Sequence, residues 1–217
     1  FKLWQILPLN PLGYGHSPYQ PFSSRAMDEV YVDLEELVSR GLIKKVPSFK
    51  AQNKHVDYEA VRSFKRKYVK EALMNFKEDR DFRAFMRQDW VFEYAVFMTF
   101  KEHNHNKAWQ KWETPYKNWI YDKKLDLSPF EEDIRYHVFV EYLLLRSFKK
   151  LKRYANSKGI RIIGDMPFYV GLDSVDVYTY QEGFILNEDG SAKLIAGVPP
   201  DYFSKDGQRW GNPIYDW

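Results

Sequence analysis

The residues best suited to chemistry lie at the end of the chain. Stretch 198–217, VPPDYFSKDGQRWGNPIYDW, sets Asp201, Gln208, Trp210 and Asn212 among further aromatic rings, prolines and glycines. A sugar stacks its C–H face on aromatic rings, and its hydroxyl groups need carboxylate, amide or guanidinium partners. The stretch has neither helical nor strand periodicity, and its prolines and glycines punctuate it. We therefore predict a long ordered loop of the functional kind, and its irregular, ring-rich setting favours a functional over a structural role for Asp201.

A second carboxylate follows a predicted strand. Segment 160–164, IRIIG, is apolar and short, as in a buried strand of a parallel sheet, and Gly159 separates it from a predicted helix over 131–157. This order is typical of an α/β fold, and in a (β/α)8 barrel the active-site groups project from the carboxyl ends of the strands. Asp165 occupies that position. A turn-capping role for Asp165 is about equally compatible with its position.

A third candidate is the loop 13–20, GYGHSPYQ, which follows a predicted buried strand over 3–9. Two glycines and a proline would present Ser17, Tyr19 and Gln20. No Gly-Lys-Ser/Thr follows, so the loop is no phosphate cradle, and it lacks the third glycine of a dinucleotide fingerprint. The structural alternative is a glycine-rich turn around a buried tyrosine.

Other polar clusters favour structural roles. We interpret Asp173 and Asp176 as an Asx-turn and a helix N-cap. His103 and His105 would face different ways at a helix end, so we expect no metal site and no cofactor. The sequence has no cysteine, which excludes disulfides and thiolate chemistry and fits a cytoplasmic protein.

Net charge and the length of the apolar runs limit the classes of partner that the sequence predicts. The net charge is only +3 and the two signs are interspersed, which argues against a dedicated nucleic-acid binder. No stretch approaches the roughly 20 apolar residues of a membrane span. Further helices are expected over 34–40, after Asp57, and over about 89–101. We divide the chain into a strand, substrate loop and helix (1–45), a mainly helical insertion (46–128), and a helix, strand and active-site loop (129–217).

Three segments together resemble a known family. WQILPLNPLGYGHSPYQPFSS, GIRIIGDMPFYVGLDSVDV and AGVPPDYFSKDGQRWGNPIYDW, in that order, are similar to the 4-α-glucanotransferases, also called amylomaltases or disproportionating enzymes. The resemblance is close at the two ends and weak through the helical middle. It implies part of a (β/α)8 TIM barrel of the α-amylase superfamily with a mainly helical inserted subdomain. It also implies transfer of α-1,4-glucan segments between maltooligosaccharides, starch or glycogen and sugar acceptors, by a retaining double displacement without a cofactor.

The resemblance also implies roles for particular residues. Asp165 would support the site without attacking the sugar, and Tyr19 would line the donor side of the cleft beside Ser17. The aromatic end stretch would close over bound glucan. Its matching residues are Asp201, Gln208, Trp210 and Asn212.

Some features depart from the family pattern. His16 replaces the usual Asp or Asn, Ser147-Phe148 replaces Gln-Trp, and residues 24–28 replace a small, glycine-containing stretch. The family's nucleophile, in an Arg-Ile-Asp-His motif, and its acid/base have no counterpart here.

The chain opens on an apolar run and closes inside the aromatic stretch. We therefore expect an internal segment of a larger enzyme, inactive alone and prone to self-association. An α-amylase-type hydrolase segment and a non-catalytic glucan-binding module remain the alternatives.

Overall fold

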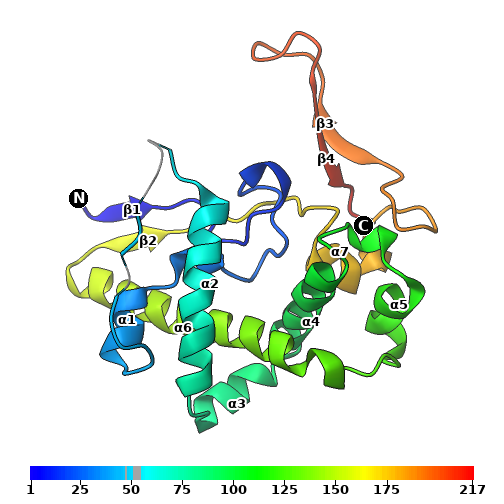
Figure 1. The fold of residues 1–217 in the computed structure, drawn as a ribbon. Helices are drawn as coiled ribbons and strands as arrows, with labels where there is room; N and C mark the ends of the chain where they lie inside the picture. Colours follow the sequence, from blue (N-terminus) through cyan, green and yellow to red (C-terminus); the bar gives the residue numbers. More distant parts are fainter. Residues whose placement is uncertain (47, 51–54) are drawn as a thin grey trace.

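The computed structural model describes residues 1–46, 48–50 and 55–217 (Figure 1). Its longest helix is α6 (Glu131–Ser157), against which several of the other helices pack. The other α-helices are α1 (Leu34–Ser39), α2 (Tyr58–Asn75), α3 (Arg80–Met86), α4 (Asp89–His103), α5 (Thr114–Asp122) and α7 (Val175–Thr179). Single 3-10 turns are η1 (Tyr14–His16), η2 (Glu29–Tyr31), η3 (Trp109–Lys111), η4 (Ser128–Phe130) and η5 (Gln181–Gly183).

The helix boundaries follow local sequence signals. Asp33 and Asp57 each accept a backbone N–H in the first turn of α1 and α2, as expected of N-cap residues. Gly41 and Gly159 have positive φ angles of 69° and 72° just beyond α1 and α6, a conformation that glycine adopts without strain. The expected helices over 34–40 and 131–157, and those beginning near Asp57 and at Asp89, are confirmed.

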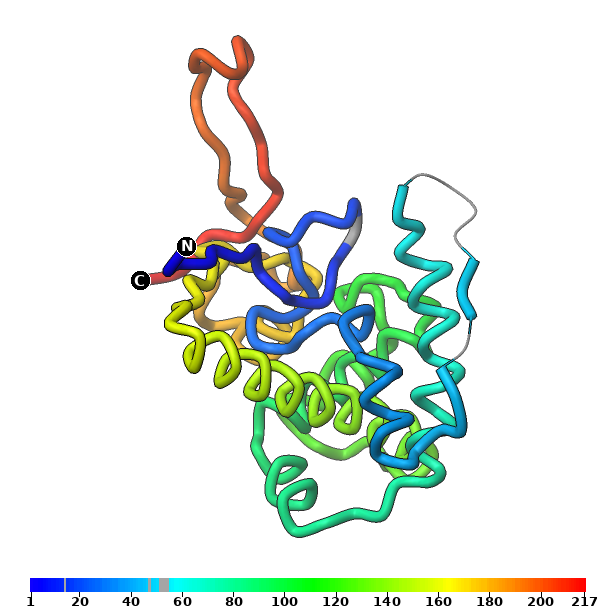
Figure 2. The backbone as a smooth tube through the Cα atoms, turned by 90° about the vertical axis from the view of Figure 1, so that its left-hand side faces the viewer, coloured from blue at the N-terminus to red at the C-terminus, as the bar shows by residue number. Residues whose placement is uncertain are grey.

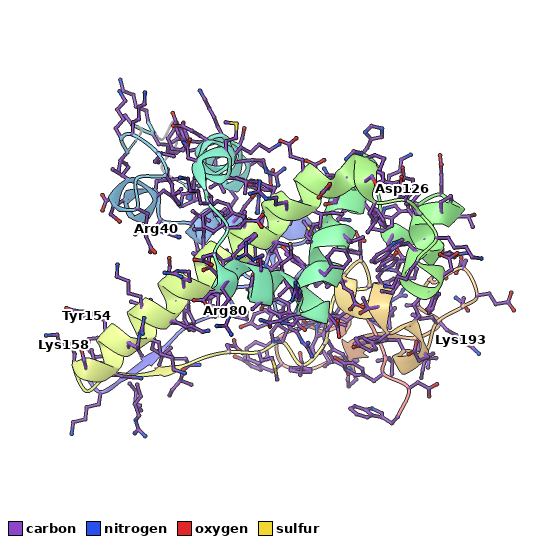
Figure 3. The ribbon with its side chains drawn as sticks, turned by 90° about the horizontal axis from the view of Figure 1, so that it is seen from below. Arg40, Arg80, Asp126, Tyr154, Lys158 and Lys193 are labelled. Atoms are coloured by element: carbon purple, nitrogen blue, oxygen red, sulfur yellow. The ribbon has the colours of Figure 1, made fainter. Side chains whose placement is uncertain are left out.

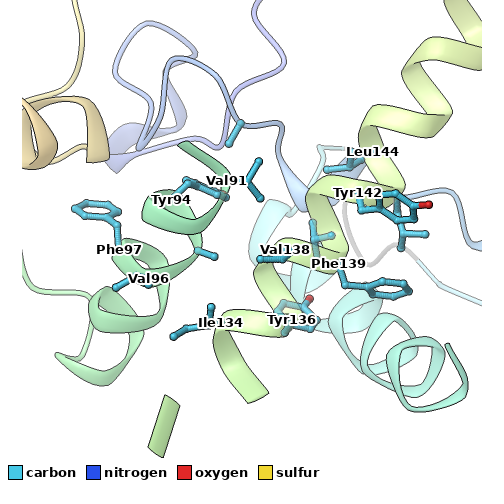
Figure 4. Packing of buried hydrophobic residues seen from close by; sticks show 14 of the residues in the cluster. Val91, Tyr94, Val96, Phe97, Ile134, Tyr136, Val138, Phe139, Tyr142 and Leu144 are labelled. Atoms are coloured by element: carbon cyan, nitrogen blue, oxygen red, sulfur yellow. The ribbon is translucent and has the colours of Figure 1, made fainter. Parts of the chain in front are cut away.

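The core lies where α4 crosses α6 (Figure 4). Helix α4 is apolar on most of its faces, so it can be buried almost all round. Phe97 of α4 and Phe139 of α6 have no exposed surface. Figure 3 shows that α6 then runs beyond this core, with Tyr154 and Lys158 at one end and Asp126 near the other.

Strands β1 (Leu3–Gln5) and β2 (Arg161–Ile163) pair in parallel, with Trp4 opposite Ile162. We predicted buried strands over 3–9 and 160–164, and both the length and the burial are wrong. Trp4 and Ile163 are 43% and 44% exposed. Among the described residues these strands pair only with each other, and α6 packs against β2, so much of the pair stays uncovered. The described residues thus contain a parallel pair of an α/β fold and no closed barrel.

The stretch predicted as a loop contains a hairpin instead. Strands β3 (Ile195–Val198) and β4 (Gln208–Pro213) are antiparallel, with Val198 opposite Gln208, and the hairpin projects from the helical body (Figure 2). In this hairpin the backbones of β3 and β4 approach each other closely. A Cβ atom on Gly197 would lie 2.3 Å from the carbonyl oxygen of Gln208, so only glycine lets the strands approach.

None of the helices within the described residues has the length and apolar character needed to cross a membrane. Helices α2 to α5 occupy the segment predicted as an insertion, 46–128, of which residues 47 and 51–54 lie outside the description. The division into three parts stays a prediction.

Candidate functional site

The structure joins the first loop to the end of β2. The hydroxyl group of Tyr19 donates a hydrogen bond of 2.9 Å to Oδ2 of Asp165. This bond to a carboxylate raises the pKa of the Tyr19 phenol above its ordinary value. The two residues stand 146 positions apart in the sequence, so their meeting is a product of the fold.

A pocket of about 740 Å³ surrounds this pair. Three chain segments contribute to its wall: the first loop, the residues after β2, and strand β4. Its lining combines aromatic rings with amide, carboxylate and guanidinium groups. The lining residues are Ser17, Tyr19, Gln20, Asp165, Met166, Pro167, Phe168, Tyr169, Arg209, Trp210 and Asn212.

The first loop is narrow at its neck. Leu12 forms an antiparallel bridge to Pro21, and the amide of Phe22 donates to the carbonyl of Pro11 at 2.9 Å. A Cβ atom on Gly13 would lie 2.2 Å from the carbonyl oxygen of Gln20, so the two sides of the neck meet only because this position is glycine. Ser17 and Tyr19 lie on the part of the loop beyond this closed neck. In Figures 1 and 2 this loop lies between α2 and the hairpin.

Two amide side chains fasten the hairpin to the pocket. Nε2 of Gln20 donates to the carbonyl oxygen of Trp210, which connects the first loop to β4. Nδ2 of Asn212 donates to the carbonyl oxygen of Val170 at 2.9 Å, and Asn212 is only 4% exposed. Trp210 is thereby held beside Tyr169, with the ring centroids 6.2 Å apart.

Replacing Asn212 with alanine is expected to cost about 1–3 kcal/mol of folding stability, because the buried carbonyl of Val170 loses its donor. Chemical denaturation measures the loss. The matched control is Asn187→Ala, since Asn187 makes its side-chain bond at an exposed turn and should cost far less. Equal losses from both replacements would contradict a fastening role for Asn212.

Of the residues that the sequence singled out, the pocket gathers Ser17, Tyr19, Gln20, Asp165, Trp210 and Asn212. Asp201 lies apart from them, in the turn of the hairpin, where its Oδ1 accepts the amides of Phe203 and Ser204 at 2.9 and 2.8 Å. Gln208 is not among the lining residues, and its Oε1 accepts the indole N–H of Trp210 at 3.1 Å.

The pocket residues that sequence reasoning missed include Met166, Phe168 and Tyr169. They directly follow Asp165 in the segment GDMPFYV. Residues just after a parallel strand share the strand's carboxyl edge, so the signal was the run of large side chains at that place. Met166 and Phe168 are 78% and 72% exposed, which leaves them available to a ligand.

The interpretation of Asp173 and Asp176 as local caps is wrong. Ser174 caps α7, and its hydroxyl oxygen accepts the amide of Val177. Asp173 instead forms an ion pair with Lys101, and Asp176 accepts the backbone amide of Ser24 at 2.8 Å. Both carboxylates connect the segment after β2 to distant parts of the chain.

Nε2 of His103 lies 3.0 Å from Oδ2 of Asp133. Across the described residues, no group of three or more His, Asp or Glu side chains is arranged to hold a metal ion.

The chain is similar to known proteins over its whole length. The family model Glyco_hydro_77, described as 4-alpha-glucanotransferase, matches residues 1–217. The 4-alpha-glucanotransferases of Thermus thermophilus and Synechocystis are 41% and 37% identical over the whole chain. A solved amylomaltase from Streptococcus agalactiae, in complex with acarbose, superposes with a TM-score of 0.89 at 41% identity. The chain spans about 45% of the length of these relatives. The match over its full length shows that the chain belongs to the 4-alpha-glucanotransferase family.

Proposed function

We propose that this chain is the segment of a 4-α-glucanotransferase that binds α-1,4-glucan. The parent enzyme would transfer glucan segments between maltooligosaccharides, starch or glycogen and sugar acceptors by a retaining double displacement. The observation that carries this proposal is the Tyr19–Asp165 hydrogen bond beside Trp210 in one ring-lined pocket. The solved relative in complex with acarbose adds support.

The proposed roles differ along the pocket. Ser17, Tyr19 and Trp210 contact the sugar, and Asp165 holds the Tyr19 hydroxyl group in place. Asn212 keeps β4 against the pocket through Val170. Asp201 and Gln208 reach a glucan only if the ligand extends along the hairpin, whose turn exposes 97% of Tyr202.

The two parallel strands would be neighbours in a (β/α)8 barrel. Three observations support this: the parallel register, the uncovered surface of Trp4 and Ile163, and relatives of about twice the length. In the longer protein further strands would cover that surface, and the chain alone would self-associate through it. A cytoplasmic location remains a prediction of the cysteine-free sequence.

The chain alone should bind glucan without converting it into products, because the resemblance assigns no reacting carboxylate to these residues. Incubation with maltotriose, followed by analysis for glucose and longer maltooligosaccharides, tests this. Robust turnover would overturn it. The same product analysis on the intact parent separates a transferase from an α-amylase-type hydrolase. A β-sandwich binding module does not fit a fold built around α4 and α6.

Binding is tested through Trp210. Trp210→Ala should weaken the binding of maltoheptaose by about tenfold or more, because central aromatic side chains contribute the largest share of binding energy. Isothermal titration calorimetry measures the affinity. Tyr154→Ala is the control, since Tyr154 is an exposed ring at the far end of α6 (Figure 3). Unchanged affinity in Trp210→Ala, or an equal loss in both variants, would reject the pocket as the glucan site.

A further inference from the structure

Helix α2 turns one face toward the loop that carries Tyr19. Counted from position 62, the side chain at 58 lies four residues earlier and those at 65 and 66 lie three and four residues later, so they share a face. All of them contact segment 12–32. Among them, Nζ of Lys65 donates to the carbonyl oxygens of Val30 and Val32, and Nη2 of Arg66 lies 3.3 Å from a carboxylate oxygen of Glu29. None of them lines the pocket around Tyr19.

The central contact is the ion pair between Arg62 and Asp28. Two guanidinium nitrogens donate to the two carboxylate oxygens of Asp28, at 2.8 and 3.2 Å. The Asp28 side chain is 1% exposed. The same carboxylate accepts the backbone amides of Leu12 and Val30, each at 3.0 Å. One buried carboxylate therefore joins α2 to the neck of the loop.

A ring contact holds the outer part of the loop. The imidazole of His16 stacks on Tyr58, with centroids 5.4 Å apart and planes 25° apart. His16 has a φ of 54° and follows Gly15 with a φ of 75°, so two consecutive residues are left-handed. This backbone costs energy for a residue with a Cβ, and surrounding contacts must sustain it. Ser17 and Tyr19 follow directly.

We propose that α2 is the positioning element of the glucan site: Arg62 and Tyr58 set the orientation of the Tyr19 loop without touching the sugar. This inference rests on the proposed function for its glucan readout only. Helix α2, which belongs to the mainly helical segment, would thus contribute to substrate binding indirectly, by orienting the Tyr19 loop.

The experiment uses hydrogen exchange and glucan binding together. The amides of Leu12, His16, Tyr19, Gln20 and Phe22 all donate hydrogen bonds, so their exchange rates report opening of the loop. Arg62→Met should speed their exchange about tenfold or more, because removing one partner of a buried pair leaves an uncompensated charge. It should also weaken maltoheptaose binding several-fold. Lys67→Met is the matched control, since Lys67 is an exposed cation of the same helix.

Tyr58→Ala supplies a second variant at a more exposed position, which leaves the Arg62–Asp28 pair intact. It should speed exchange at His16, Tyr19 and Gln20 and leave Leu12 protected. Unchanged loop exchange in both variants would overturn the proposal. So would a uniform rise that includes the amides of α4 and α6, because that would be general destabilisation. If the unaltered chain bound no maltoheptaose, the proposed function would fail, while the exchange rates would still decide whether α2 holds the loop.

Discussion

Replacing Glu141 with glutamine is expected to stabilise the protein by about 3 kcal/mol at pH 7, the reverse of the usual effect of a core substitution. Glu141 lies on α6 and is 1% exposed. Burial raises the pKa of its carboxyl group to about 8. The groups that face it are the backbone amide of Met27, which donates to it at 3.1 Å, and the side chains of Asp28 and Tyr94. The repulsive charge of Asp28 adds to the effect of burial on the pKa.

The change in the free energy of unfolding with pH follows from the difference in proton binding between the folded and unfolded states. In the unfolded chain the carboxyl group of Glu141 titrates near its model value of 4.5, and in the folded chain near 8. Between these values the folded state holds a proton that the unfolded state has released, so the free energy of unfolding falls as pH rises. The loss is about 1.4 kcal/mol per pH unit across that window. Glutamine keeps an acceptor for the Met27 amide and carries no proton to lose.

Urea denaturation from pH 4.5 to 9 measures this difference. The stabilities of the unaltered chain and Glu141→Gln should agree near pH 4.5 and separate steadily up to about pH 8. Glu188→Gln is the control, because Glu188 is exposed and its replacement should leave the profile nearly unchanged. A constant difference at every pH, or lower stability of Glu141→Gln at pH 7, would contradict a buried protonated carboxyl group.

Local signals in the sequence predicted the helices well. Asp57 and the three- and four-residue spacing after it indicated α2, and Gly159 marked the end of α6, because caps and periodicity depend on near neighbours. Hairpin β3–β4 could not be predicted in the same way. Its strands approach through Gly197, and its turn contains Gly207 at a φ of 73°, so no alternation of apolar and polar side chains marks it.

The site was predictable in its parts but not in its connections. The residue types indicated a sugar site, and resemblance assigned Tyr19 and Asp165 to it, whereas their hydrogen bond exists only in the fold. Asp173 and Asp176 looked like local caps, since short-range roles are the usual ones for aspartate in loops. Their partners Lys101 and Ser24 stand 72 and 152 residues away, and no local pattern encodes such a distance.

Lys101→Met is expected to cost about 3–5 kcal/mol, a large share of the stability of a typical domain. The Lys101 side chain on α4 is 1% exposed, and its ammonium group contacts the Asp173 carboxylate and lies 4.6 Å from the ring centroid of Phe22. Burial lowers the pKa of Lys101, while the charge of Asp173 opposes this change. Without the cation, Asp173 keeps the backbone amide of Trp109 as a donor but remains a largely buried, unbalanced charge.

The double variant Lys101→Met/Asp173→Asn should recover part of that loss, because asparagine retains an acceptor for the Trp109 amide and removes the charge. Thermal and urea denaturation of the single and double variants give the coupling, and Lys152→Met, at an exposed position on α6, is the control. A double variant as unstable as Lys101→Met would mean that the lysine contributes through its other contacts, which include hydrogen bonds to the carbonyl oxygens of Asn106 and Lys107, and not by balancing the charge of Asp173. Because Phe22 closes the neck of the first loop and Asp173 follows the pocket segment, the contacts of Lys101 with these two residues join α4 to both sides of the site. Lys101→Met should therefore loosen the pocket before the protein unfolds, seen as faster exchange of the Phe22 amide than of the α6 amides.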